Sequence, residues 1–263
     1  MAKTFAVVGS DARQQAAGRY LAQHGCTVTG AEGVYRADYI LLPMPLDADR
    51  AGLARLLRAA RPGTAAFGGR VSSAVQAAGQ AAGVPIWDYY QREELAELNA
   101  VPTAEGCLAL LLEHRARTIW GSRMLVVGYG RIGRALAQRL RALGAQVTVA
   151  ARRAGTRACA QADGCRAVGI SALRQEAAKT DCIINTVPAL VLTEEVLSGA
   201  GAGALVVDLA SEPGGTDFAA AKARGIQALH ALSLPAKFAP ETAGELVGSV
   251  VLQMLKEREE GAK

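Results

Sequence analysis

The segment Gly128-Tyr-Gly-Arg-Ile-Gly133 has the residue types and spacing to hold a pyrophosphate. It directly follows an apolar run at 124–127 and directly precedes a helical pattern over 131–143. In that context the first glycine permits a tight turn, the second lets the backbone approach a phosphate, and the third lets helix and strand pack closely. The start of the helix also offers unpaired N–H groups to an anion. We therefore predict a dinucleotide site at Gly128, Tyr129, Gly130, Arg131, Ile132 and Gly133, in preference to an unliganded glycine-rich turn.

The next strand predicts which dinucleotide binds. An NAD site typically places Asp or Glu about twenty residues beyond the first glycine, on the ribose 2′-hydroxyl. Here the strand predicted at 147–150 is followed by Ala151, Arg152 and Arg153. Two guanidinium groups suit a 2′-phosphate. We expect NADP (or NADPH), with NAD less favoured; the alternative is that both arginines only face solvent.

Two later strands, at 182–186 and 205–209, end in small or polar residues. Because the carboxyl ends of parallel strands border the ligand crevice, these ends are expected near the nicotinamide. The residues concerned are Thr186, Val187, Pro188, Leu209, Ala210 and Ser211. For any one of them, a plain loop role fits equally well.

Strand and helix patterns alternate along both halves of the chain, which favours parallel sheets covered on both faces. Strands are expected at 4–8, 27–30, 39–42, 64–67, 85–87, 124–127, 147–150, 182–186, 205–209 and 226–229. A turn at 9–13 is expected to open a helix that runs to about residue 24, and further helices are expected at 48–60, 72–82, 104–117, 131–143 and 240–257. The predicted class is α/β, with two doubly wound parallel-sheet domains and a cleft between them. The first is a flavodoxin-like substrate domain (1–101, plus the helix 240–258), 102–118 form a connecting helix, and 119–239 form a Rossmann NADP-binding domain.

Composition excludes several classes of protein. The 263 residues include 29 Lys+Arg and 24 Asp+Glu, a net charge of +5, without a dense basic tract, so nucleic acid is not an expected partner. The five cysteines show no CxxC spacing, which argues against a metal site and fits a reduced cytosol. No apolar run has the length of a membrane helix, and no secretory signal is evident at the start. We expect a soluble cytoplasmic protein.

Five segments together resemble the family of dipicolinate synthase A subunits, over essentially the whole chain. They are Gly9-Ser-Asp-Ala-Arg-Gln14, Val101-Pro-Thr-Ala-Glu-Gly106, Gly128-Tyr-Gly-Arg-Ile-Gly133, Asp208-Leu-Ala-Ser-Glu-Pro-Gly-Gly-Thr-Asp-Phe218 and Leu234-Pro-Ala-Lys-Phe-Ala-Pro-Glu-Thr-Ala-Gly244. The glycine motif is common to many dehydrogenases, whereas the last two segments are far more specific.

The resemblance implies an NADP-dependent oxidoreductase. A hydroxy-tetrahydrodipicolinate would lose water, pass a hydride to NADP⁺ and become aromatic dipicolinate (pyridine-2,6-dicarboxylate). It further implies that the partner is a flavoprotein-like B subunit, and it implies a place in sporulation and a location in the mother-cell cytoplasm of a spore-forming bacterium. A homodimer is compatible with it.

Residue roles follow from matching that chemistry to the chain. A dicarboxylate needs cations or N–H groups, for which Ser10, Arg13, Pro102, Thr103 and Gly106 are the expected substrate-binding residues. Proton transfer is assigned to Lys237, in an expected loop between prolines, or to Glu105. The alternatives are that Arg13 is solvated, and that Glu105 only caps a helix starting near Thr103. Thr216-Asp217 is expected to start a helix.

Two other functions remain open. One is a D-2-hydroxy-acid or methylene-folate dehydrogenase of similar plan, although the former normally uses a His–Glu pair and His230 is isolated. The other is an NADP-binding subunit without chemistry of its own. The residues do not decide among them.

Overall fold

The computed structural model describes residues 2–44, 46, 49–201 and 203–261 and divides into two compact units. Unit 1 contains Met1–Asn99 and Ala239–Lys263, and unit 2 contains Ala100–Phe238. The first boundary falls inside a long helix, α4 (Glu93–Glu113), and the second just before α11 (Pro240–Gly261). Unit 1 is therefore built from two separate stretches of the chain.

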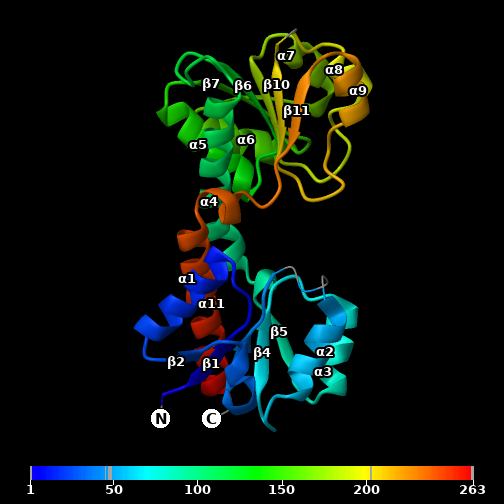
Figure 1. Ribbon diagram of the computed structural model, residues 1–263. Helices are drawn as coiled ribbons and strands as arrows, with labels where there is room; N and C mark the ends of the chain where they lie inside the picture. Colours follow the sequence, from blue (N-terminus) through cyan, green and yellow to red (C-terminus); the bar gives the residue numbers. More distant parts are fainter. Residues whose placement is uncertain (1, 45, 47–48, 202, 262–263) are drawn as a thin grey trace. The chain divides into compact units, whose positions relative to one another are not determined.

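The described part of unit 1 contains a sheet of five parallel strands in the order β2-β1-β3-β4-β5 (Figure 1). The strands are β1 (Thr4–Val7), β2 (Thr27–Thr29), β3 (Tyr39–Leu41), β4 (Ala65–Gly68) and β5 (Ile86–Asp88). The helical segments are α1 (Ala12–Gln23), η1 (Ala31–Arg36), α2 (Arg50–Arg58), α3 (Ser73–Ala81) and η3 (Tyr89–Gln91). The strand order reverses between β1 and β3, which is where doubly wound sheets open a crevice for ligands.

Two apolar layers cover the sheet of unit 1. On one face Val34, Leu57 and Val75 bring η1, α2 and α3 onto the strands. On the other face α1 and α11 pack together, contributing Leu21 and Val251 among others. The two helices approach very closely, because a Cβ at Gly244 of α11 would overlap the carbonyl oxygen of Arg13. Glycine is therefore required at that crossing.

Unit 2 has six parallel strands among its described residues, in the order β11-β10-β9-β6-β7-β8. They are β6 (Arg123–Val127), β7 (Gln146–Ala150), β8 (Arg166–Val168), β9 (Cys182–Asn185), β10 (Leu205–Asp208) and β11 (Gln227–His230). The helical segments are α5 (Arg131–Ala142), α6 (Ala154–Ala162), η4 (Ile170–Ala172), α7 (Leu173–Ala177), α8 (Glu194–Leu197), α9 (Phe218–Ala223) and α10 (Leu234–Phe238). This is the strand order of dinucleotide-binding domains, so the predicted α/β class with two parallel sheets is confirmed.

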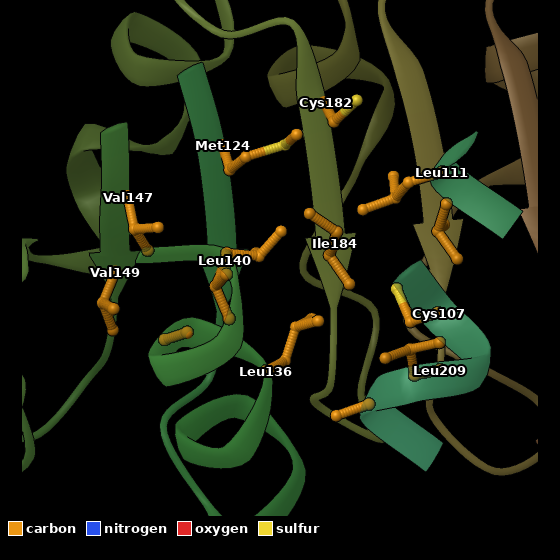
Figure 2. Close-up of a cluster of buried hydrophobic side chains, with 14 of the residues drawn as sticks. Cys107, Leu111, Met124, Leu136, Leu140, Val147, Val149, Cys182, Ile184 and Leu209 are labelled. Carbon is orange, nitrogen blue, oxygen red and sulfur yellow. The ribbon is translucent and has the colours of Figure 1, made fainter. Parts of the chain in front are cut away.

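The second half of α4 belongs to the core of unit 2. Figure 2 shows Cys107 and Leu111 of α4 on the same face of the sheet as Leu136 and Leu140 of α5. By length and composition α4 is apolar enough to cross a membrane. Its residues Ala104, Cys107 and Leu111 are fully buried against the strands, which accounts for that composition without a membrane.

Three sequence-based expectations about elements were wrong. The helix expected from Ala104, in a connector over 102–118, begins at Glu93, so that Pro102 lies in its interior and not in its first turn. Lys237, expected in a loop, lies in the short helix α10. Strand β8 was missed, because its three residues form no apolar run and Arg166 is exposed.

Candidate functional site

A cavity of about 480 Å³ lies at the carboxyl ends of the strands in unit 2. Loops after β6, β7 and β9 supply its walls. Of the predicted cofactor residues, the structure places these around it: Gly128, Tyr129, Gly130, Ala151, Arg152, Arg153, Thr186, Val187 and Pro188. Residues that the sequence predicted at the ends of three strands therefore do line one cavity.

The glycine motif has the geometry that a pyrophosphate needs. Gly128 has φ +93°, and a Cβ there would overlap Oγ1 of Thr186. A Cβ at Gly133 would overlap the carbonyl oxygen of Gly128. By contrast, nothing lies within 4 Å of a Cβ at Gly130, the N-cap of α5, which makes no side-chain capping bond. Open space and uncapped N–H groups at a helix start suit an anion, so these residues fit a bound dinucleotide.

Tyr129 fixes the glycine loop in place. Its hydroxyl donates to Oδ2 of Asp163 over 2.8 Å, joining the loop after β6 to the end of α6. Burial, and then this bond to Asp163, raises the pKa of the Tyr129 phenol. The phenol therefore remains a neutral donor at physiological pH, and the loop is held without a charge of its own.

The end of β7 carries two cations and no carboxylate. Arg152 and Arg153 are exposed, and among the described residues neither guanidinium has a hydrogen bond or an ion pair. Helix α6 begins immediately afterwards, with Arg153 as its N-cap and no side-chain capping bond. Thr156, in the first turn of α6, also lines the cavity. Two free guanidinium groups beside an uncapped helix start can bind a dianionic phosphate.

The remaining predicted cofactor residues lie outside the cavity lining. Arg131 and Ile132 form the first turn of α5, and the side chain of Ile132 packs toward the core. Leu209 is buried in the core, and Ala210 and Ser211 belong to the loop after β10. This loop starts from Asp208, whose importance the sequence reasoning missed.

Asp208 is fully buried and surrounded by hydrogen-bond donors. Its carboxylate accepts bonds from the Asn185 amide (2.9 Å), the Thr216 hydroxyl (2.7 Å), and the backbone N–H groups of Ala210 (3.0 Å) and Gly215 (2.7 Å). The sequence feature that could have indicated this network is a carboxylate at the end of an otherwise apolar strand. Asp217, next to this network, caps α9, so the helix start predicted at Thr216-Asp217 is confirmed.

His230 also borders this loop. Its Nε2 lies 3.0 Å from the carbonyl oxygen of Ala210, and its ring lies 5.4 Å from that of Phe218. No carboxylate among the described residues pairs with it. Within the described residues, His230 therefore does not form the His–carboxylate pair that 2-hydroxy-acid dehydrogenases use as acid and base.

Lys237 lines a separate cavity of about 320 Å³ in unit 2, together with His230, Leu234 and Phe238. Helix α10, which carries it, packs on α4 at Gly106, where a Cβ would lie 2.9 Å from Leu234. The Lys237 side chain is exposed, and its ammonium group has no partner among the described residues. The packing of α10 on Gly106 therefore sets the position of the Lys237 ammonium group.

The other predicted residues of unit 2 lie on α4. Glu105 is exposed, and its Oε1 is 3.3 Å from Nη2 of Arg139. Pro102 and Thr103 are buried inside the helix. The expectation that Thr103 offers free N–H groups at a helix start, or that Glu105 caps it, was wrong, since α4 begins ten residues before Thr103.

In unit 1, Ser10 is exposed, and Arg13 lies in the first turn of α1, which Asp11 caps. Nη2 of Arg13 donates to the carbonyl oxygen of Met44 over 2.7 Å. Arg13 thereby joins the loops after β1 and β3, at the switch point of the sheet. Its side chain is only 13% exposed, so it is not the solvated arginine of the alternative interpretation.

The comparisons with known proteins agree with this geometry. A family model described as the NAD-binding domain of D-isomer-specific 2-hydroxyacid dehydrogenases matches residues 110–204. The A subunit of dipicolinate synthase from Bacillus subtilis is 40% identical over 168 residues, which cover 64% of this chain and 57% of that protein.

Solved structures extend the similarity to the full chain. The A subunit of dipicolinate synthase from Bacillus halodurans superposes with a TM-score of 0.87 at 31% identity, covering 96% of this chain and 97% of the other. A transhydrogenase from Sinorhizobium meliloti superposes with a TM-score of 0.77 at 17% identity, covering 97% of this chain and 94% of the other. At that identity the transhydrogenase shows a common fold only.

Proposed function

Because the chain belongs to the family of dipicolinate synthase A subunits, we propose that it is an NADP-dependent oxidoreductase that forms dipicolinate from a hydroxy-tetrahydrodipicolinate. The membership and the dehydrogenase-type domain make it an oxidoreductase that uses a nicotinamide cofactor. The observation that carries the choice of NADP is the pair of unpartnered guanidinium groups, Arg152 and Arg153, at the rim of the cofactor cavity.

The proposed reaction removes water and then a hydride and a proton from the ring. The nicotinamide of a bound cofactor supplies the hydride acceptor. Lys237 is the proposed proton carrier: its ammonium group protonates the departing hydroxyl, and the resulting amine takes the ring proton lost in the same dehydration. The second ring proton, lost on aromatisation together with the hydride, passes to solvent. Glu105 is the second proposed acid/base, although its ion pair with Arg139 favours Lys237.

The substrate is a dianion, so its binding needs fixed positive charge. The partly buried Arg13 supports this role best, and Ser10 lies three residues before it, in the loop that precedes α1. Pro102, Thr103 and Gly106 are retained as proposed binding residues on the strength of the family resemblance alone.

The family name also supports proposals about context. The relatives are named as the A component of a synthase, so we expect a second component, which the resemblance makes a flavoprotein-like B subunit. Function during sporulation in the mother-cell cytoplasm, with or without homodimer formation, belongs to the same proposal.

The first prediction concerns cofactor choice. NADPH should bind the full-length protein more tightly than NADH in a fluorescence titration. The double variant Arg152→Ala/Arg153→Ala should lose about 30-fold in NADPH affinity, because charge-assisted bonds to the phosphate are removed, while NADH affinity stays unchanged. Arg224→Ala, an exposed arginine that pairs with Glu194, is the matched control. Tighter binding of NADH by the unaltered protein would contradict the proposal.

The second prediction concerns Lys237. Lys237→Ala should lower kcat by about 100-fold, the usual worth of a proton-transfer group, with NADPH affinity unchanged. Lys237→Arg should restore substrate affinity but not turnover. Lys222→Ala on α9 serves as the control, and each protein is assayed alone and with the B subunit. Full turnover by Lys237→Ala would exclude the assigned role.

A further inference from the structure

Four loops of unit 1 converge at the carboxyl ends of its strands. Arg13 comes from the first turn of α1, Met44 follows β3, Gly69 follows β4, and Tyr89 follows β5. This edge includes the β1–β3 switch point, where doubly wound sheets bind ligands. Tyr89 was not among the residues predicted from the sequence.

The Tyr89 side chain is the largest fully buried one in the described residues, with 1% of its surface exposed. Its hydroxyl nevertheless forms no hydrogen bond with any described residue. Burial raises the pKa of this phenol, against the opposing effect of the nearby Arg13 charge. The hydroxyl is therefore a neutral O–H donor without a protein partner among the described residues, and it is not among the fully enclosed unpaired atoms found there, so it is open to a ligand.

Arg13 brings a positive charge to the same place. Its Nη2 is bound to Met44, and its Nε lies 3.9 Å from the largely exposed carboxylate of Asp11. A guanidinium has five N–H donors, so this one retains donors for a further acceptor. Arg13 and Tyr89 together thus offer a cation and a neutral donor, the combination that binds a carboxylate.

Gly69 lets the loop after β4 approach the Tyr89 hydroxyl and Met44 so closely that no side chain fits at this position. A Cβ at Gly69 would lie 2.7 Å from the Tyr89 hydroxyl and 2.7 Å from Sδ of Met44. The loop is held firmly, because Asp88 accepts bonds from the N–H groups of Arg70 (3.2 Å), Val71 (3.0 Å) and Tyr90 (2.8 Å). Arg70 has φ +56°, a strained backbone conformation of the kind that clusters at ligand sites.

We propose that the Tyr89 hydroxyl and the Arg13 guanidinium form a carboxylate-binding subsite bordered by Gly69. The subsite takes one of the two carboxylates of the pyridine-dicarboxylate product or its precursor. This inference rests on the proposed function for the identity of the ligand. It makes Tyr89 a residue that determines affinity for the acid.

The test is calorimetric titration of the full-length protein, saturated with NADP⁺, with dipicolinate. Tyr89→Phe should weaken binding about tenfold, as expected for a lost hydrogen bond to a charged group. Its melting temperature should not fall, because the hydroxyl has no partner within the protein to lose. In turnover assays KM should rise with little change in kcat. Tyr90→Phe, the exposed neighbour, is the matched control.

A second variant tests the position of the donor. Gly69→Ala should abolish dipicolinate binding, because its methyl group would displace the Tyr89 hydroxyl, while leaving NADPH affinity unchanged. If the unaltered protein binds NADPH but not dipicolinate, the proposed substrate is wrong. If it binds dipicolinate and Tyr89→Phe binds equally well, the subsite is wrong and the proposed function stands.

Discussion

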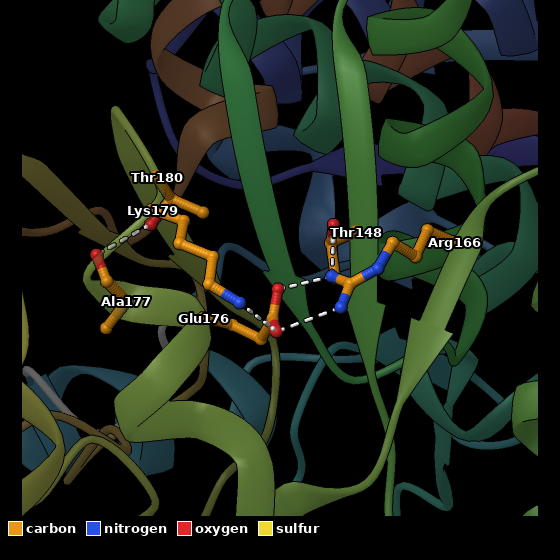
Figure 3. A network of polar contacts seen from close by, with 6 residues as sticks. All are labelled: Thr148, Arg166, Glu176, Ala177, Lys179 and Thr180. Carbon is orange, nitrogen blue, oxygen red and sulfur yellow. Dashed lines mark hydrogen bonds and ion pairs between the residues drawn. The ribbon is translucent and has the colours of Figure 1, made fainter.

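Two buried carboxylates in unit 2 are stabilised in different ways. Asp208 is surrounded by neutral donors, namely two side chains and two backbone N–H groups. Glu176, which is 5% exposed, instead accepts bonds from Nη1 of Arg166, from Nη2 of Arg166 (2.9 Å) and from Nζ of Lys179 (3.5 Å), as Figure 3 shows. Asp208 fixes a loop beside the candidate site, whereas Glu176 joins α7 to the edge strand β8.

The third prediction concerns Glu176 and pH. The bonds from Arg166 are the largest influence and lower the pKa of Glu176 below its ordinary value of 4.5. A depressed pKa in the folded state gives stability that is fully present above pH 4.5 and is lost as the pH falls through the folded-state pKa. Glu176→Gln should therefore lower the free energy of unfolding at pH 7 by about 1 kcal/mol, a modest figure because solvent screens the half-exposed Arg166.

Denaturant unfolding at a series of pH values measures this effect. The difference between Glu176→Gln and the unaltered protein should shrink as the pH falls below 4.5. Glu194→Gln, in an exposed pair with Arg224, should change little at any pH. A difference that is constant from pH 7 to pH 3 would argue against the ion pair as its origin.

At the scale of elements, close helix crossings set the positions of Lys237 and Arg13, the residues proposed to act on the substrate. Gly106 lets α10 pack on α4 and so positions Lys237, and Gly244 lets α11 pack on the turn of α1 that carries Arg13. The sequence predicted most strands to within a few residues, but it did not predict the short helices α6, α7, α8 and α10. It missed the start of α4, because Pro102 suggested a first turn and only tertiary packing stabilises a helix through an interior proline.

The fourth prediction concerns the crossing of α1 and α11. Gly244→Ala should destabilise unit 1 by about 1–3 kcal/mol, because its methyl group meets backbone atoms of Arg13 and Ala17 that cannot move aside. Gly261→Ala, in the same helix with nothing within 4 Å, is the matched control and should not destabilise. Thermal unfolding monitored by Trp87 in unit 1, with Trp120 replaced by Phe in all variants, measures the change. Equal stability of the two variants would contradict the tight crossing.

At the scale of the whole molecule, the sequence predicted sites formed by short motifs and missed sites formed by residues from distant segments. The candidate cofactor cavity was predictable because its glycines, Arg152 and Arg153 follow strands at characteristic spacing. The Asp208 network and the surroundings of the Tyr89 hydroxyl were not, because the groups around them come from separate loops and only folding brings them together.

The division of the chain also bears on the order in which the protein is made. Unit 2 is one continuous stretch, Ala100–Phe238, whereas unit 1 needs α11 to cover one face of its sheet. Domains generally fold as units during translation. On the ribosome, the half that is synthesised first must therefore wait, with α1 alone over one side of its strands, until the second half has already emerged and closed its own core.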